Sequence, residues 1–257
     1  MNRSFLSNID GKNAILKKRI IARCINEDGY SIADLSKELN TSIPTITKLV
    51  GELMDERFLV DMGKQGTNGG RRPSIYGLNP SAGYFVGTDV KKKSISIAVT
   101  NFKGQIVDYF EDLPFTVENS ESSFRTLCTT IKKHISDSGI ESSKVLAYGV
   151  NLTGRVNNET GYCFTYFIGE DRPIGEFLED ELRAPVFVEN DSRAMTYGEY
   201  ICGVGNNEKN MLFITRNEGF ANHLASLRAH GDILKIRIGR RKTPRLSKRL
   251  RIRRVNA

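Results

Sequence analysis

The chain has no tryptophan and only four cysteines among its 257 residues. The cysteines lie far apart, form no C-x-x-C pair and have no histidine at metal-ligand spacing: Cys24, Cys128, Cys163 and Cys202. We expect them to be reduced and buried, packing as small apolar side chains. A nucleophilic thiol is the alternative, and scattered cysteines of this kind favour packing. The sequence therefore predicts no metal site and no cofactor.

Long apolar runs are also missing. No stretch approaches the roughly 18 to 20 uninterrupted apolar residues that a membrane helix needs. Residues 1–10 contain no apolar run suited to a signal peptide. These absences predict a cytoplasmic protein without a membrane partner.

Most of the chain has no excess of positive charge, although the formal net charge of the whole is +8. Residues 215–257 hold 13 Lys or Arg and 2 Asp or Glu, a net charge of +11. The first 214 residues hold 25 and 28, a net charge of −3. The isoelectric point of about 9.3 therefore reflects the tail, and any argument for nucleic-acid binding has to rest on local patterns.

Helical patterns come first along the chain. Residues 12–26 carry isoleucines at helical spacing and end before Asp28-Gly29. Ser31 precedes a second helix that ends near Asn40, and Asp34 stands three residues after Ser31, as in a capping box. Both segments predict short amphipathic helices.

A third helix follows Ser42, a suitable cap, and Pro44 sits in its first turn, where no amide donor is required. Its inward face is predicted to be Ile43, Ile46, Val50 and Leu53, and its outward face Thr45, Thr47, Lys48 and Glu52. A tight polar turn joins the second and third helices. This arrangement is typical of a helix-turn-helix.

Two short strands, 58–60 and 75–78, flank a glycine-rich basic loop, which predicts a wing. We therefore predict an all-α winged helix-turn-helix DNA-binding domain over residues 12–78. Its candidate DNA contacts are Ser42, Thr45, Thr47 and Lys48 on the third helix and Arg71 and Arg72 in the loop. The alternatives are a solvated helix face and a simple interdomain linker.

From residue 82 the pattern becomes that of an α/β domain. Strands are predicted at 84–90, 94–100 and 105–112, joined as an antiparallel meander. Helices and strands then alternate: helix 120–137, strand 145–152, helix 174–182, strand 186–189, helix 192–201 and strand 210–214. We place this domain at residues 82–214.

Several segments together resemble the ROK family, which groups repressors with sugar kinases, and specifically its N-acetylglucosamine and xylose repressor-like members. They are 69–73 (GGRRP), 87–90 (GTDV), 149–157 (GVNLTGRVN) and 188–195 (VENDSRAM), the last running into Gly198-Glu199. The resemblance covers about residues 12–214. It implies that the second domain is one lobe of an actin-like (ribonuclease H-like) sugar kinase fold.

The resemblance also implies a function. The chain is expected to be a sequence-specific transcriptional repressor of sugar metabolism genes, with a double-stranded DNA operator, a sugar or sugar phosphate effector and a homo-oligomeric state.

Asn190-Asp191 resemble the pair that grips sugar hydroxyls in the family, and Asp191 is the equivalent of the kinase base. Gly154 lies in a segment that resembles the loop beneath the sugar. The alternatives are that the Asn-Asp pair only caps the helix starting at Ser192 and that Gly154 marks a simple turn.

Departures from the family pattern argue against an enzyme. Family kinases begin this lobe with a glycine-rich phosphate loop, whereas this chain has Asp89-Val-Lys-Lys-Lys-Ser94. His223 and His230 have no accompanying cysteines, so the family's zinc motif is not carried over. The competing function is an ATP-dependent hexose kinase.

Residues 215–257 lose the family pattern and become rich in arginine. We expect no regular structure there, and we expect a frame shift or truncation after about residue 214. The alternatives are a basic tail that adds nonspecific DNA affinity and a non-functional fragment.

Overall fold

The computed structural model describes residues 11–27, 29–64, 73–166, 172–203, 210–216, 222–228 and 233–234. By their internal contacts the residues form two compact units, 1–191 and 192–257, and each is described by itself. The predicted boundaries at residues 78–82 and 214 stay predictions.

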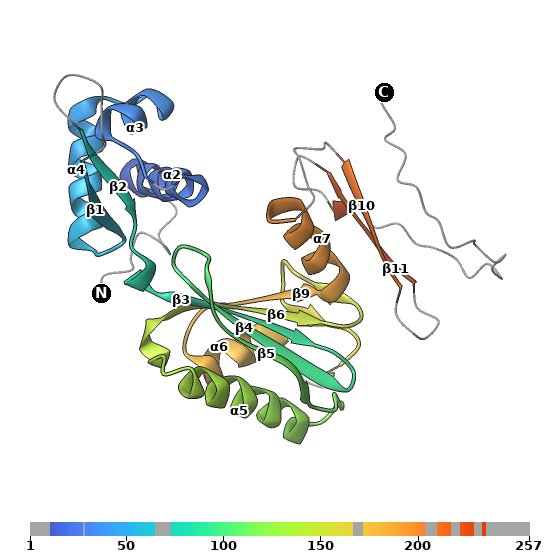
Figure 1. The fold of residues 1–257 in the computed structure, drawn as a ribbon. Coiled ribbons are helices and arrows are strands. Elements are labelled where there is room, and N and C mark those ends of the chain that lie inside the picture. The colour runs from blue at the N-terminus through green and yellow to red at the C-terminus, as the bar shows by residue number, and fades with distance from the viewer. Residues whose placement is uncertain are drawn as a thin grey trace. The chain divides into compact units, whose positions relative to one another are not determined.

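The first unit begins with the three predicted helices, which the structure confirms: α2 (Lys12–Asn26), α3 (Ile32–Glu38) and α4 (Ile43–Asp55) (Figure 1). Both predicted caps form. The Ser31 hydroxyl accepts a hydrogen bond from the Asp34 amide at 3.2 Å, and the Ser42 hydroxyl accepts one from the Thr45 amide at 3.4 Å. These bonds satisfy amides that have no partner within the helix, which fixes where α3 and α4 begin.

The helices bury one shared core, made of Leu16, Ile20, Cys24, Leu35, Leu39, Ile46, Leu49, Val50 and Leu53. Three isoleucines predicted on apolar stripes are exposed instead. Ile15 and Ile25, at the two ends of the stripe predicted on residues 12–26, are 50% and 57% exposed. Ile43 is 56% exposed. It is the first residue of α4, where no turn precedes it to cover its side chain, so helical spacing alone assigned it to the wrong face.

A two-stranded antiparallel sheet follows, with β1 (Leu59–Lys64) and β2 (Ser74–Leu78) paired at Leu59 and Leu78. Tyr30, between α2 and α3, exchanges two backbone hydrogen bonds of 2.9 Å with Tyr76 of β2. The sheet is thereby attached to the helices. Arg71 and Arg72 lie outside the described residues.

The larger part of this unit is a five-stranded sheet in the order β5-β4-β3-β6-β9. Its strands are β3 (Tyr84–Val90), β4 (Ser94–Asn101), β5 (Ile106–Pro114), β6 (Val145–Leu152) and β9 (Val186–Asn190). β4 runs antiparallel to its neighbours β3 and β5, whereas β3, β6 and β9 are mutually parallel. The predicted α/β class with a mixed sheet is confirmed.

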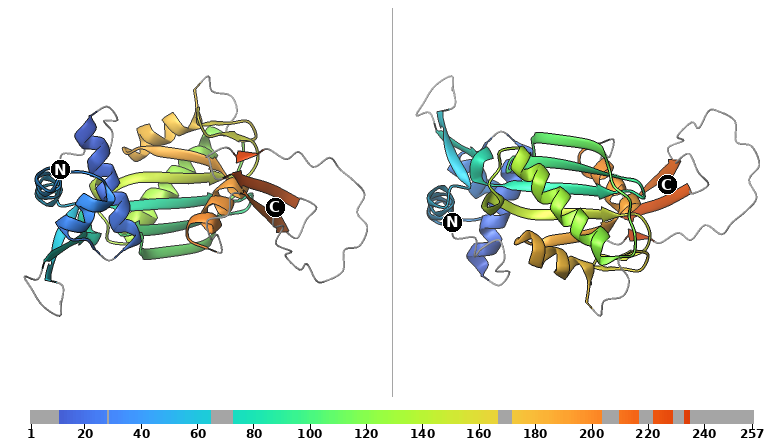
Figure 2. Two further views of the ribbon diagram at one scale, coloured as in Figure 1. Left: turned by 90° about the horizontal axis from the view of Figure 1, so that it is seen from above. Right: turned by 90° about the horizontal axis from the view of Figure 1, so that it is seen from below.

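Helices α5 (Glu121–Asp137) and α6 (Ile174–Leu182) cover one face of this sheet, as the views from above and below show (Figure 2). Apolar side chains alternate along the strands toward these helices, among them Val86, Val90, Tyr148, Val150 and Val188, and join Leu127, Ile131 and Leu178 in one core. The intervening residues of β3, β6 and β9 therefore face the opposite side.

The helical region and the sheet share residues of a single apolar cluster. Ala82 follows β2 in the short helix η1 (Pro80–Ala82), Phe102 lies in the turn after β4, and Leu146 belongs to β6; all three pack in the core of the first three helices. The Phe102 amide also donates a 3.2 Å hydrogen bond to the Pro80 carbonyl. The connection after β2 is therefore packed and hydrogen-bonded.

Four short elements of the first unit escaped prediction: η1, η2 (Ser142–Lys144) and the hairpin of β7 (Val156–Asn157) and β8 (Tyr162–Cys163). Two-residue strands carry too little periodicity to be recognised. Helix α7 (Asp191–Ile201) begins one residue earlier than expected.

The second unit contains strands β10 (Asn210–Arg216), β11 (Asn222–Arg228) and β12 (Ile233–Leu234), joined in that order as an antiparallel sheet. We expected no regular structure from residue 215, and this is wrong for the last two residues of β10, for β11 and for β12. All seven residues of β10 pair with all seven of β11. Pairing with a distant strand satisfies the backbone, which local composition does not reveal.

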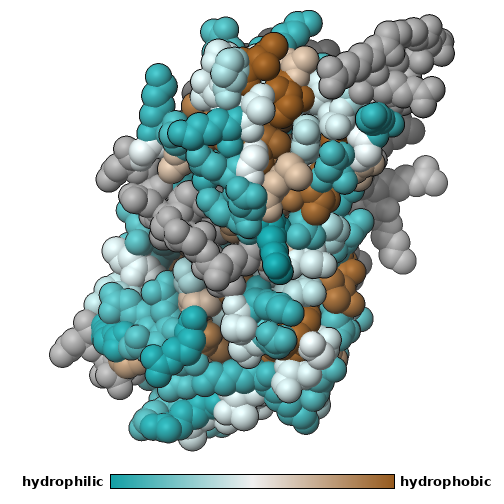
Figure 3. Space-filling view, turned by 90° about the vertical axis from the view of Figure 1, so that its left-hand side faces the viewer, coloured by the Kyte–Doolittle hydropathy of each residue, from teal (hydrophilic) through white to brown (hydrophobic). Residues whose placement is uncertain are grey.

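Hydrophilic side chains cover most of the face drawn in Figure 3, and apolar ones form narrow patches between them. Among the described residues, no helix is long and apolar enough to cross a membrane. Cys24, Cys128 and Cys163 are free and buried, as expected, whereas Cys202 is exposed, which corrects the prediction for that residue. Burial raises the pKa of the Cys24 thiol to about 11, which suits a packing role.

Candidate functional site

The outward face of α4 carries the predicted DNA contacts. Thr47 is exposed, and its hydroxyl donates a 2.9 Å hydrogen bond to the Ile43 carbonyl. Lys48 is also exposed, and its ammonium nitrogen lies 3.9 Å from a Glu52 carboxylate oxygen. That pair is long and exposed to solvent, so the Lys48 side chain is available to a stronger anion.

Ser42 and Thr45 lie together at the start of α4. Their hydroxyl oxygens are 2.8 Å apart, and the Ser42 hydroxyl also holds the Thr45 amide. Ser42 is exposed and Thr45 is half-buried. The structure thus brings all four predicted residues of α4 onto or beside one surface, with Ser42 and Thr45 already engaged in the cap.

The second candidate region lies where β6 and β9 end. Gly154 follows β6 with a φ of 111°, a conformation that favours glycine. The Asn190 side-chain amide donates to the Gly154 carbonyl at 2.7 Å and to an Asp191 carboxylate oxygen at 2.9 Å. The three residues predicted to contact a sugar therefore lie in one hydrogen-bonded group.

A row of polar residues crosses the sheet on the face opposite α5. Strand pairing places Ser96 beside Asp89, Asp89 beside Asn151, and Asn151 beside Glu189. Because β3, β6 and β9 are parallel, their carboxyl ends meet at one edge, the usual position of ligand sites in such sheets.

Small residues lie one step back along the same face. Ala98, Gly87 and Gly149 stand side by side on the three central strands. They add little bulk to the face beneath the polar row.

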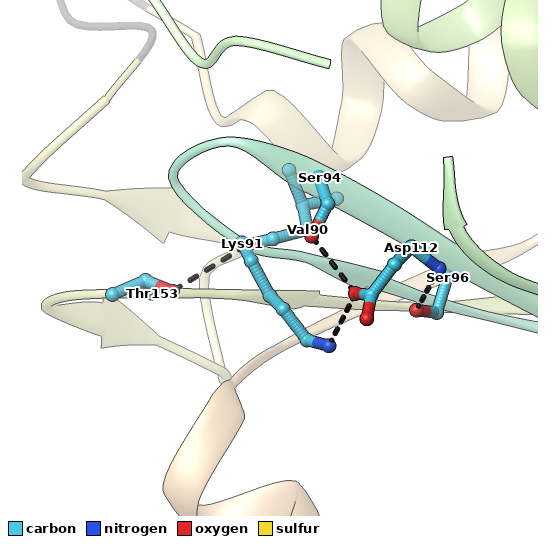
Figure 4. A network of polar contacts seen from close by, with 6 residues as sticks. All are labelled: Val90, Lys91, Ser94, Ser96, Asp112 and Thr153. Carbon is cyan, nitrogen blue, oxygen red and sulfur yellow. Dashed lines mark hydrogen bonds and ion pairs between the residues drawn. The ribbon is translucent and has the colours of Figure 1, made fainter. Parts of the chain in front are cut away.

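The turn between β3 and β4 holds Lys91, Lys92 and Lys93. Figure 4 shows the contacts of Lys91. The Lys91 ammonium group lies 2.8 Å from an oxygen of Asp112 in β5, and that same oxygen accepts a 3.0 Å hydrogen bond from the Ser94 hydroxyl. The Lys91 amide donates to the Ser94 carbonyl at 2.9 Å, which closes a tight turn. Both the charge and the amide of Lys91 are therefore engaged within the protein.

Backbone contacts hold the rest of this turn. The Lys92 carbonyl accepts a 3.2 Å hydrogen bond from Val117, and the Lys93 carbonyl accepts one of 3.3 Å from Phe115. The Thr153 hydroxyl donates to the Val90 carbonyl at 3.5 Å, which links the turn to the loop carrying Gly154 (Figure 4).

The electrostatics of the polar row are dominated by carboxylates. Burial raises the pKa of Asp89, and the negative charges of Asp191 and Asp112 raise it further, whereas Lys91 opposes the shift. Hydrogen bonds from Lys91 and Ser94 lower the pKa of Asp112. The field at this edge is therefore negative, which suits hydroxyl donors better than anions.

Sequence reasoning missed Asn151, Glu189 and Asp112. Asn151 and Glu189 could have been found from the alternation of β6 and β9, since each precedes the end of a parallel strand by one residue. Asp112 has a φ of 47° and lies at an irregularity of β5. No pattern in the sequence predicts its position beside Lys91.

Comparison with known proteins shows a family to which this sequence is similar. The family model described as "ROK family" matches residues 85–222. The chain belongs to the ROK family. The match runs past residue 214, where we expected the family pattern to end.

Among relatives of this ROK chain, the xylose repressor of Bacillus subtilis (strain 168) is 26% identical over 205 residues, which is 79% of this chain and 53% of that protein. The glucokinase of Halalkalibacterium halodurans is 30% identical over 154 residues, 59% of this chain and 46% of that enzyme. The ROK chain therefore spans about half the length of the curated relatives it matches.

A solved structure titled as a ROK family transcriptional regulator, a homolog of the E. coli MLC protein, superposes with a TM-score of 0.67 at 20% identity. It covers 86% of this chain, and this chain covers 56% of it. The likeness shows that the ROK chain shares the fold of that protein over most of its own length.

Proposed function

We propose that this chain is a DNA-binding transcriptional repressor whose affinity for its operator responds to a sugar. One observation carries the proposal. Residues 82–257 number only 176, so a similarity to xylose repressors over 205 residues has to include part of residues 12–78. The glucokinase similarity, over 154 residues, does not require it.

In this proposal residues 12–78 act as a winged helix-turn-helix. Helices α3 and α4 pack on each other and on α2, and α4 exposes Thr47 and Lys48 along its outer face. An α-helix fits the major groove, where a hydroxyl can donate to or accept from base edges and a lysine can donate to guanine. Ser42 and Thr45 direct the start of α4 toward the duplex, and Arg71 and Arg72 enter the minor groove from the wing.

The effector site is the group of Gly154, Asn190 and Asp191. The Asn190 amide orients the Asp191 carboxylate at 2.9 Å, and each carboxylate oxygen can accept more than one hydrogen bond from sugar hydroxyls. Gly154 brings the backbone close to the ligand. We propose a neutral sugar in preference to a sugar phosphate, because the neighbouring carboxylates of Asp89 and Asp191 would repel an added phosphate.

The repressor acts in the cytoplasm as a homo-oligomer, since a two-fold assembly matches a palindromic operator. Half-sites are then spaced by whole helical turns of about 34 to 36 Å.

Sugar kinase activity is the second candidate, because Asp191 resembles the residue that serves as the base in the family's kinases. The turn at Lys91 argues against it. A phosphate-binding loop needs several backbone amides directed at the ligand, whereas the Lys91 amide is bonded to Ser94 and the Lys91 side chain to Asp112. We expect no transfer of phosphate from ATP to D-glucose or D-xylose.

The deciding experiment selects duplexes from a random library with the full chain and measures their affinity with and without D-xylose or D-glucose. We expect a defined site whose binding weakens about tenfold with Thr47→Ala or Lys48→Ala and changes when one of the sugars is added. Selection of no common sequence contradicts the repressor. A response to sugar that persists in Asp191→Ala contradicts the effector site.

A further inference from the structure

The region of residues 12–78, called the head below, contains a cleft that no sequence pattern predicted. It has a volume of about 770 Å³ and is lined by Lys12, Asn13, Leu16 and Arg19 of α2, by Leu39, Asn40 and Thr41 of the turn before α4, and by Ser42 and Thr45 of α4 itself. Leu16 and Leu39 are buried, and the exposed lining residues are polar or basic. The cleft thus has an apolar floor and polar walls.

Its charge is entirely positive. The lining includes Lys12 and Arg19 and no acidic residue. Among the described residues, no ion pair is formed by either of these two cations. Three carboxylates of the head pair with other cations of α2 instead: Glu52 and Glu56 with Lys17, and Glu38 with Arg23.

The backbone adds to this field. Both α2 and α4 begin at the cleft, α2 at Lys12 and α4 at Ile43, and the N-terminal end of a helix carries partial positive charge. Neither helix has an acidic residue in its first turn to offset that charge. Lys12 even places a cation at the positive end of α2, an arrangement that disfavours the isolated helix and becomes favourable beside an anion.

The dimensions match a chain of phosphates. Lys12 and Arg19 are seven residues apart on α2, about 10 Å along the helix axis. Each phosphate on a strand carries one negative charge, and a protein binds the backbone by neutralising several of them, so two cations at this separation can each meet a different phosphate. The cleft also adjoins Ser42 and Thr45, beside the face of α4 that carries Thr47 and Lys48.

We propose that this cleft grips the sugar-phosphate backbone of double-stranded DNA, with Lys12 and Arg19 as phosphate contacts. The inference rests on the proposed function and extends it to two residues of α2. They set the depth and angle at which α4 meets the groove and carry no sequence information themselves.

The test measures dissociation constants of the full chain between about 50 and 200 mM salt, on a mixed-sequence duplex and on a duplex selected from a random library. The variants are Lys12→Ala, Arg19→Ala and both together. Lys133→Ala is the matched control, since Lys133 is exposed on α5 and lies outside the cleft. Circular dichroism melting checks that each variant folds, and Lys12→Gln and Arg19→Gln provide a second pair with longer side chains.

We expect each cleft variant to weaken binding about tenfold on both duplexes alike, and to reduce the slope of log affinity against log salt by about 0.9 per side chain. Lys133→Ala should leave the slope unchanged.

A double variant with the slope of the unaltered chain overturns the cleft as a phosphate site. A loss of affinity confined to the selected duplex also overturns it, because it would mean that Lys12 and Arg19 contact bases. If the unaltered chain selects no site but its salt slope on the mixed duplex still depends on Lys12 and Arg19, the repressor proposal fails and the cleft stands.

Discussion

The ring of Phe102, in the turn after β4, lies 5.3 Å from the ring of Phe58, which follows α4, with an angle of 44° between their planes. The turn of the sheet thus reaches into the core of the helices that include the proposed recognition helix. Leu146 joins the same cluster from β6, the strand that leads at its other end to Gly154. A contact between the two regions therefore exists at one end of a strand whose other end meets the proposed effector site.

Replacing Phe102 should destabilise both regions. Phe102→Ala removes a buried ring (7% exposed) and leaves a cavity, so we expect the free energy of unfolding to fall by about 3 kcal/mol in urea titrations. Phe85→Ala is the control, since the Phe85 ring packs 6.1 Å from Phe102 but is 39% exposed; its cost should be about 1 kcal/mol. Equal losses for the two variants would mean that Phe102 is not a core residue of the junction.

Lys17 should contribute more to stability than the other ion-paired lysine of this region. It is 7% exposed and lies 2.9 Å from Glu52 and 2.7 Å from Glu56. Lys17→Met would remove the buried cation that the two carboxylates share and leave Glu52 only its 3.9 Å contact with Lys48, at a cost of about 3 kcal/mol. Lys48→Met should change stability by less than about 0.5 kcal/mol. Restoration by Glu52→Gln and Glu56→Gln in the Lys17→Met background is expected, and its absence would show that the cost has another origin.

The same cluster predicts a pH dependence. Burial alone would lower the pKa of Lys17, but hydrogen bonds to Glu56 and Glu52 raise it above the ordinary 10.5. Because the pKa is higher in the folded state, the stabilisation is fully present below pH 10.5 and is lost as pH rises through the folded-state value. Urea titrations above that pH should show a decline that is smaller in Lys17→Met. An equal decline in the free energy of unfolding of both proteins would contradict a contribution of Lys17 to the pH dependence.

The Lys91–Asp112 pair can be tested by titrating the Asp112 carboxyl group by NMR. Its pKa is lowered by hydrogen bonds from Lys91 and Ser94, so its stabilising effect is present above the ordinary value of 3.8 and is lost as pH falls through the lower folded-state value. In Lys91→Met the pKa of Asp112 should return toward 3.8. Lys93→Met is the control and should leave it low, since Lys93 forms no ion pair among the described residues. Equal changes of the Asp112 pKa in the two variants would mean that nearby positive charge in general, and not the contact with Lys91, lowers it.

Gly154 should tolerate alanine far less well than Gly87. A Cβ at Gly154 would lie 2.4 Å from the Thr165 hydroxyl oxygen, at a φ of 111°, whereas a Cβ at Gly87 meets nothing within 4 Å. We expect Gly154→Ala to cost about 1 to 3 kcal/mol and to weaken the sugar response, and Gly87→Ala to stay within about 0.5 kcal/mol. Urea titrations measure both. A harmless Gly154→Ala would mean that the loop has no need of glycine.

Local sequence patterns were enough for most elements. Helices 12–26 and 174–182 and strands 84–90 and 145–152 were predicted with their observed bounds, because periodicity, caps and turns are properties of neighbouring residues. The grouping of Gly154 with Asn190 and Asp191 came from the family resemblance, and the hydrogen bonds among them are consistent with it.

Other features depend on residues that are distant in the chain. Nothing near Lys12 or Arg19 distinguishes them from ordinary surface cations; only the packing of α2 against the turn before α4 places them around one cleft. Likewise, Lys91 and Asp112 are 21 residues apart and meet because β4 returns the chain alongside β5.

The sequence by itself determined where most of the helices and strands form, the α/β class and the family, since each depends on short-range spacing or on motifs. The tertiary structure alone decided which charges are neutralised and which are left facing solvent. Lys17 and Lys12 stand five residues apart on one helix, yet one is buried between two carboxylates and the other lines an acid-free cleft. The difference arises because burial and charge pairing depend on which elements pack together, and that is a property of the whole fold.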